Sequence, residues 1–278
     1  MNVKTKDLIF KTWIIISTII VFLIVTFIFG YIFINGLSSI NLEFIFGNPK
    51  GMPIGLEGGI FPAIVGSLFL MFIACIFASI LAISTSLYSV FYAKSKRIES
   101  IIHLIVQTMA GIPSIVLGLF GYTLLVLNLR LGRSLLSGGI TLGIMIFPYI
   151  QVRVEKTLSQ VNKDIIGSSY ALGISKPHTI LRLILPLCKT DIISAITMAG
   201  GFAMGASAPI ILTAAVLFAP IPKTLSAPVM ALPFHLYMLT GEGISLEKAY
   251  GTALVLIMIL LIINITALTL NITKRNDR

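Results

Sequence analysis

The sequence predicts an all-α membrane protein with six transmembrane helices. Of its 278 residues 57% are hydrophobic and 11% are charged, whereas soluble domains carry about 25% charged residues. A helix needs about 20 apolar residues to cross the hydrocarbon core, and six long stretches contain no Asp, Glu, Lys or Arg. These observations exclude a secreted globular protein and a disordered chain. The predicted spans are 12–42, 58–93, 100–129, 134–152, 192–222 and 249–273.

The first span follows a basic start, as a signal peptide would. Residues 14–34 are uncharged and no clear small-residue cleavage site follows them, so we expect a retained membrane anchor. A cytoplasmic N-terminus (1–11), a permease domain (12–273) and a cytoplasmic tail (274–278) are the predicted divisions. Cys75 and Cys188 are far apart in the chain and are expected to pack as small hydrophobes.

The basic residues predict the orientation of the chain. The chain holds 20 Lys and Arg against 10 Asp and Glu, and cytoplasmic loops carry the excess of positive charge. The N-terminus, residues 94–99, residues 151–191 and the tail hold 15 of the 20 basic residues. We therefore expect a multi-pass protein of the cell membrane with both termini in the cytoplasm. The net charge of +10 follows from topology, so no nucleic-acid partner is expected.

Two segments outside the predicted spans are long. Residues 35–59 are expected to form an external loop. Residues 224–241 are uncharged but contain Pro228, Pro233 and His235, which favours an external or re-entrant segment over a continuous helix.

Several kinds of chemistry are missing from the sequence. No predicted span contains an acidic residue, whereas ion-coupled carriers usually hold an ionisable group in the bilayer. His103, His178 and His235 are expected to be structural or interfacial. The chain lacks the GxxxxGK[ST] loop that cradles nucleotide phosphates, so it is not expected to hydrolyse ATP or to bind a cofactor or metal. Energy for uphill transport would have to come from another polypeptide.

Residues 151–191 form the longest cytoplasmic segment and contain a predicted helix, turn and helix. Gly173 permits a sharp turn, the second helix restarts at Lys176, and Pro186 is expected to end it. The segment resembles the coupling segment of ABC-transporter permeases, because Gly173 is followed after nine residues by Leu183 and then by Leu185 and Pro186. That resemblance implies contact with an ATPase through Ser169, Ala171 and Gly173, although Gly167 stands where the family has Glu.

The predicted third span carries the string AGIPSIVLGLFGY, residues 110–122. Small residues at spacings of three, four and seven let a neighbouring helix approach closely, and helix packing alone would account for them. The string also resembles the GxPSIxxGLFG signature of phosphate ABC-transporter permeases of the PstA type. Residues 58–70, 134–148 and 230–239 resemble the same family in the same order, which implies the type I importer permease fold.

The predicted fifth span departs from this family. Where the family reads Gly-Arg-Ala-x-Gly-Glu-Thr-Ala-Pro, this chain has GFAMGASAP at 201–209, with Phe202, Ala206 and Ser207 in place of Arg, Glu and Thr. An Arg fork suits an oxyanion, so its loss leaves open a paralogue that carries another solute. The residues expected to line the translocation pathway are Pro113, Ser114, Gly205, Ser207, Pro209 and Thr213.

The resemblance implies a permease subunit of an ATP-driven importer, most simply for inorganic phosphate. Its implied partners are a second permease subunit of the PstC type, cytoplasmic ATP-binding subunits, an extracytoplasmic solute-binding protein and the lipid bilayer. An ion-coupled secondary carrier and a non-transporting membrane scaffold remain alternatives from other classes.

Overall fold

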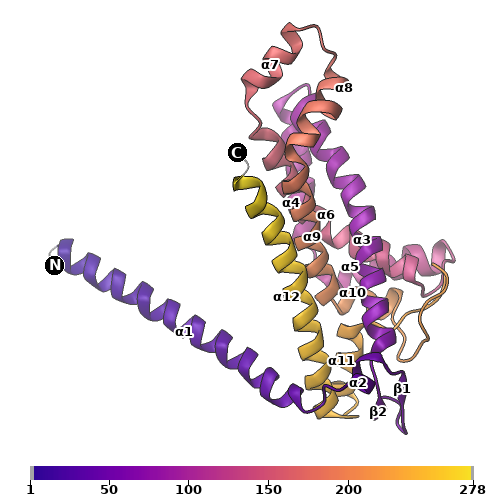
Figure 1. Cartoon of the computed structure of the whole chain (residues 1–278). Coiled ribbons are helices and arrows are strands. Elements are labelled where there is room, and N and C mark those ends of the chain that lie inside the picture. The colour runs from indigo at the N-terminus through magenta and orange to yellow at the C-terminus, as the bar shows by residue number, and fades with distance from the viewer. Residues whose placement is uncertain (1–2, 277–278) are drawn as a thin grey trace.

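The computed structural model describes residues 3–276 and shows a helical bundle from which one long helix projects (Figure 1). Positions 1–2 of the predicted N-terminal segment and 277–278 of the predicted tail lie outside the described residues. Three segments, named η, are π-helical. The elements are α1 (Val3–Leu37), α2 (Leu42–Phe46), β1 (Pro49–Lys50), β2 (Glu57–Gly58), α3 (Phe61–Leu87), η1 (Tyr88–Tyr92), α4 (Lys96–Ala110), α5 (Ser114–Gly121), η2 (Tyr122–Asn128), α6 (Leu135–Ser159), α7 (Lys163–Ala171), α8 (Lys176–Thr179), η3 (Ile180–Ile184), α9 (Leu185–Gly205), α10 (Ala208–Thr213), α11 (Leu232–Gly241) and α12 (Leu246–Asn276).

Four helical segments of the described chain are long and apolar enough to cross a membrane. They are Ile9–Leu37, Phe61–Tyr92, Leu135–Ser159 and Leu246–Thr269, and α4 with α5 makes a fifth if the bent pair is one span. The mainly helical membrane architecture is therefore confirmed. The predicted count of six is not, because α9 does not belong to this set. That helix contains Lys189 and Asp191, which lower its hydropathy.

The predicted third span is not one straight helix. α4 and α5 meet at 96° across Gly111, Ile112 and Pro113. Gly111 caps α4, and Pro113 disfavours helical geometry at Ile112, the residue before it. The bend places Pro113 and Ser114 at the start of a second helix that runs in a different direction from α4 (Figure 1).

The predicted fifth span, 192–222, is also wrong as a continuous helix. Its helix α9 begins earlier, at Leu185, and ends at Gly205, where Ala206 takes an extended conformation. The short α10 follows, and the chain from 214 to 231 has no helix. This last segment caps α6, because the N–H groups of Leu135 and Leu136 donate to the carbonyls of Ala227 and Leu225 at 2.9 Å.

Acidic residues do occur within helices that can span the membrane, contrary to the expectation. α6 continues seven residues past the predicted end at 152, which brings Glu155 into the segment. Glu247 lies in the first turn of α12. The boundary shift has a simple cause, since an apolar window stops at a charge whereas a helix does not.

The core of the bundle forms where α3 packs against α6. Small residues recur every fourth position on α3, with Ala74, Ala78 and Ala82 fully buried. Facing them, a Cβ at Gly139 would lie 2.4 Å from the Ile73 side chain, so only glycine fits there. Such small-residue seams let helix backbones approach closely in membranes.

The projecting α1 meets the bundle at its C-terminal end. There Gly36 lies directly against the backbone of Tyr250 on α12, and the rings of Tyr31 and Tyr250 are 5.7 Å apart. At the same end of the molecule, β1 and β2 form a small antiparallel hairpin whose Gly58 carbonyl accepts a 2.8 Å hydrogen bond from Lys248. Most of the apolar surface of α1 is exposed.

Candidate coupling and translocation sites

The helix, turn and helix predicted around Gly173 are present at one end of the bundle, as α7 and α8 (Figure 1). Gly173 has φ +75°, the left-handed region that favours glycine. The Gly173 N–H donates to Tyr170, and the Ile174 N–H donates to Ser169, at 2.9 and 3.2 Å. Gly173 therefore closes the turn through its backbone.

The three predicted coupling residues have different environments. Ala171 and Gly173 are exposed, whereas Ser169 is buried and its hydroxyl lies 2.8 Å from that of Thr179. Ser169 therefore holds α7 to α8. The role of all three in coupling stays a prediction.

The exposed tip of this segment is apolar, a feature that the sequence analysis missed. Leu172 is 79% exposed, and Ile165, Tyr170 and Ile174 are exposed around it. The available signal was the presence of five large apolar residues between the charged Asp164 and Lys176. Apolar side chains that remain exposed outside the membrane spans indicate a binding surface for another protein.

A lysine fastens the segment to the bundle. The Lys176 ammonium donates to the carbonyl of Phe91 in η1 and lies 4.5 Å from the centroid of the Tyr92 ring. Cation–π contacts of this kind add to the hydrogen bond. The segment is therefore attached to the end of the α3 span as well as to its own helix.

The second helix of the segment does not stop at Pro186, contrary to the expectation. α8, η3 and α9 follow one another without an interruption from Lys176 to Gly205. In η3 the hydrogen bonds are wider, so that the Leu185 N–H donates to Ile180. Pro186 stands directly after this wider turn, so its missing N–H falls where the helix changes from π to α hydrogen bonding.

The predicted pathway residues gather around the break between α9 and α10 and the bend before α5. A Cβ at Gly118 of α5 would lie 3.0 Å from the Pro209 Cα of α10, so the two short helices touch through their backbones. Close contact of this kind requires the small residues noted in the sequence. The structure thus brings together two motifs that are about 90 residues apart in the chain.

Four of these residues have some exposure and two do not. Pro113 and Gly205 are exposed, and Ser114 and Ser207 are partly exposed. Pro209 and Thr213 are buried, and the Thr213 hydroxyl donates to the Pro209 carbonyl at 2.8 Å. The two serine hydroxyls are therefore better placed to meet a solute than that of Thr213, and all six assignments stay predictions.

Phe202 stands where the resembling family has Arg, and it is paired with an aromatic ring. Its ring lies 4.9 Å from that of Tyr149 on α6, at an interplanar angle of 51°. Both side chains are about half exposed. This part of the α6 and α9 surface is aromatic in place of the cationic surface that the resemblance implied.

Comparison with known proteins supports the fold and the family. The family model described as "Binding-protein-dependent transport system inner membrane component" matches residues 82–278. A probable phosphate transport system permease protein PstA of Methanocaldococcus jannaschii is 32% identical over 77% of this chain and 80% of its own. A probable ABC transporter permease protein YqgI of Bacillus subtilis is 26% identical over 96% and 95%.

Solved structures agree at the level of the fold. An inward-facing form of the MetNI methionine ABC transporter has a TM-score of 0.63 and 15% identity, and the match covers 74% of this chain and 91% of that one. An amino acid ABC transporter has a TM-score of 0.54 at the same identity, with 78% and 92% covered. The described chain is therefore a multi-pass membrane protein with the ABC importer permease fold, and it belongs to the family of binding-protein-dependent transport system inner membrane components.

Proposed function

We propose that this chain is the phosphate-carrying permease subunit of an ATP-driven importer and has no ATPase site of its own. The observation that carries the proposal is the α7–α8 segment with its exposed apolar tip, because it offers a separate ATPase a surface that is connected to two spans. Relatives named for phosphate transport support the choice of solute. Both termini lie in the cytoplasm with this segment, and the hairpin end faces a solute-binding protein.

Expression with candidate partners tests the proposal directly. In a host that lacks its own phosphate importers, the chain with its companion permease, ATPase and binding protein should restore uptake of labelled phosphate. Omission of the ATPase should abolish that uptake, since the chain lacks a nucleotide-binding loop. Uptake by the chain alone under an ion gradient would instead establish a secondary carrier, and a full assembly that moves no solute would establish a scaffold.

The buried histidine of α11 argues against the ion-coupled alternative. Burial, together with the charge of Lys248, lowers the pKa of His235 to about 4. The side chain is therefore neutral near pH 7 and does not exchange protons there. Its Nδ1 lies 3.4 Å from the Thr252 hydroxyl, which is a structural contact between α11 and α12.

The aromatic pair favours a second candidate, a paralogue for a solute other than phosphate. If this surface lines the pathway, Phe202→Arg should change the apparent KM for phosphate several-fold, because it adds a cation beside the Tyr149 ring. Ile193→Arg is the matched control, since Ile193 is exposed on the same helix about 180° away. Labelled-phosphate uptake across a concentration series measures both.

An equal KM for Phe202→Arg and the unmodified chain would place Phe202 on a packing or lipid-facing surface. Competition by sulfate and by neutral solutes, in the unmodified assembly, then decides whether phosphate or another solute is preferred.

A further inference from the structure

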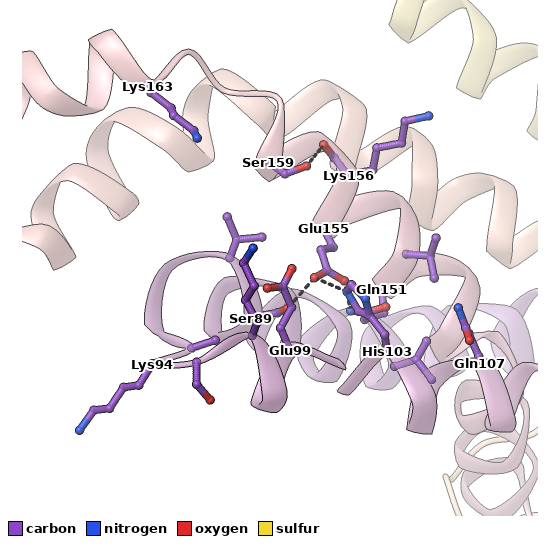
Figure 2. Close-up of a pocket in the computed structure, with 16 residues that line it drawn as sticks. Ser89, Lys94, Glu99, His103, Gln107, Gln151, Glu155, Lys156, Ser159 and Lys163 are labelled. Atoms are coloured by element: carbon purple, nitrogen blue, oxygen red, sulfur yellow. Dashed lines mark hydrogen bonds and ion pairs between the residues drawn. The ribbon is translucent and has the colours of Figure 1, made fainter. Parts of the chain in front are cut away.

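A polar cluster lies between α4 and α6, away from the coupling tip and the α5–α10 contact. Glu99 and His103 are four residues apart on α4, and Gln151 and Glu155 are four residues apart on α6. Residues at this spacing share one face of a helix. The two pairs meet beside a pocket of about 810 Å³ that all four residues line (Figure 2).

The ligand-forming atoms of this cluster are close together. His103 Nε2 lies 2.9 Å from Glu155 Oε1, and one ligand atom from each of Glu99, His103 and Glu155 lies within 4.8 Å of the others. The Ser89 hydroxyl also donates to Glu155. A metal ion at about 2.0–2.2 Å from each ligand atom needs these atoms to lie within about 4.4 Å of one another, which a small rotation of the exposed Glu99 side chain would allow.

Gln151 provides a second, independent observation. Its side-chain nitrogen donates to Glu155 Oε2 at 2.7 Å, which fixes the orientation of the amide. Its Oε1 is buried and has no hydrogen-bond partner among the described residues, and the whole residue is 0% exposed. A buried acceptor without a partner costs about 1–3 kcal/mol, so this oxygen, on a residue that lines the pocket, is available to accept a hydrogen bond.

Both acidic and basic side chains line the pocket. The carboxylate of Glu155, which is 13% exposed, lies at the floor, and the lysines at 94, 96, 156 and 163 line the pocket. Lys94, Lys96, Lys156 and Lys163 are exposed, so their charges are screened by water and salt. They lower the affinity for a cation without blocking the carboxylates.

We propose that Glu99, His103 and Glu155 bind one divalent transition-metal ion, with Zn²⁺ as the probe, and that Gln151 Oε1 accepts a hydrogen bond from a water on the metal. Two carboxylates and one imidazole are ligands that suit Zn²⁺, whereas Mg²⁺ and Ca²⁺ prefer oxygen alone. Binding would join α4 to α6 beside the bend that leads to α5. The proposal stands independently of the solute that is transported.

Binding of Zn²⁺ to the purified full-length chain tests the site. The chain, in detergent and without a histidine tag, is titrated with Zn²⁺ against a chromogenic chelator, and Co²⁺ absorption reports the geometry. We expect one ion per chain and a loss of affinity of about tenfold or more in His103→Gln and in Glu99→Gln. His178→Gln is the matched control, because His178 is exposed on α8 outside the cluster.

Each outcome of the Zn²⁺ titration either supports or overturns the proposed metal site. Glu99 and His103 are exposed, so their variants should fold, and melting curves without metal verify this. Weaker binding in both variants with unchanged binding in His178→Gln supports the site. Unchanged affinity in His103→Gln, or no bound Zn²⁺ in the unmodified chain, reduces the cluster to a histidine–glutamate ion pair and overturns the proposal.

Discussion

Gly173→Val is expected to leave the subunit in the membrane and to abolish ATP-driven uptake while ATP hydrolysis continues. Gly173 has φ +75°, and nothing lies within 4 Å of a Cβ placed there. The substitution therefore costs free energy through the backbone conformation and not through a steric clash. A left-handed residue other than glycine costs about 1–2 kcal/mol, and a β-branched residue such as valine costs more. The turn would reopen, and the apolar tip beside Leu172 would change position.

Gly173→Asn is the matched control, because Asn tolerates the left-handed region. It should retain most of the uptake although its side chain is of similar size to valine. ATP hydrolysis and uptake are measured in vesicles that contain the complete transporter. Normal uptake in Gly173→Val would show that the turn has no coupling role, and equal losses in both variants would show that bulk at this position matters instead of backbone geometry.

Gly121→Ala is expected to lower the melting temperature of the purified subunit. A Cβ at Gly121 would lie 2.2 Å from Thr141 Oγ1 and 2.8 Å from its Cγ2, so one of the two helices must shift. Overpacking of this kind costs about 1–3 kcal/mol. Within a helix, alanine stabilises the folded chain by about 1 kcal/mol relative to glycine. A net fall in the melting temperature would therefore show that overpacking between α5 and α6 outweighs this gain.

A second substitution should rescue this loss. Thr141→Ala removes both crowding atoms, and the double variant should melt closer to the unmodified chain than Gly121→Ala alone. Gly30→Ala on α1 is the control, since a Cβ there meets nothing within 4 Å, and it should not lower the melting temperature. Additive losses in the double variant would mean that the two positions do not touch.

The sequence was sufficient to predict the fold class but not the positions of the breaks. Apolar windows located the helices α1, α3, α6 and α12 because hydropathy responds to composition. The same windows could not separate α4 from α5, since a bent pair and a straight span have the same composition. The signal for the bend was Pro113 after Gly111.

At the candidate site, motifs predicted which segments meet but not how individual side chains lie. Gly173 was predicted as the turn because its missing side chain has a direct backbone consequence. The burial of Ser169 and the contact between Lys176 and Phe91 depend on the packing of α8 against η1, which no local pattern encodes. The charge of Arg153 ended the predicted span before Glu155, although the helix continues to Ser159.

The unbroken helix from Lys176 to Gly205 sets how far a displacement can travel. About 30 residues at roughly 1.5 Å per residue make a rod of about 45 Å, comparable to the full thickness of a bilayer with its headgroups. One end of this helix is fastened to η1 through Lys176, and η3 together with Pro186 is a point at which the helix can bend. A displacement imposed at α8 would therefore be divided between bending at η3 and tilting of α9 toward Ala206.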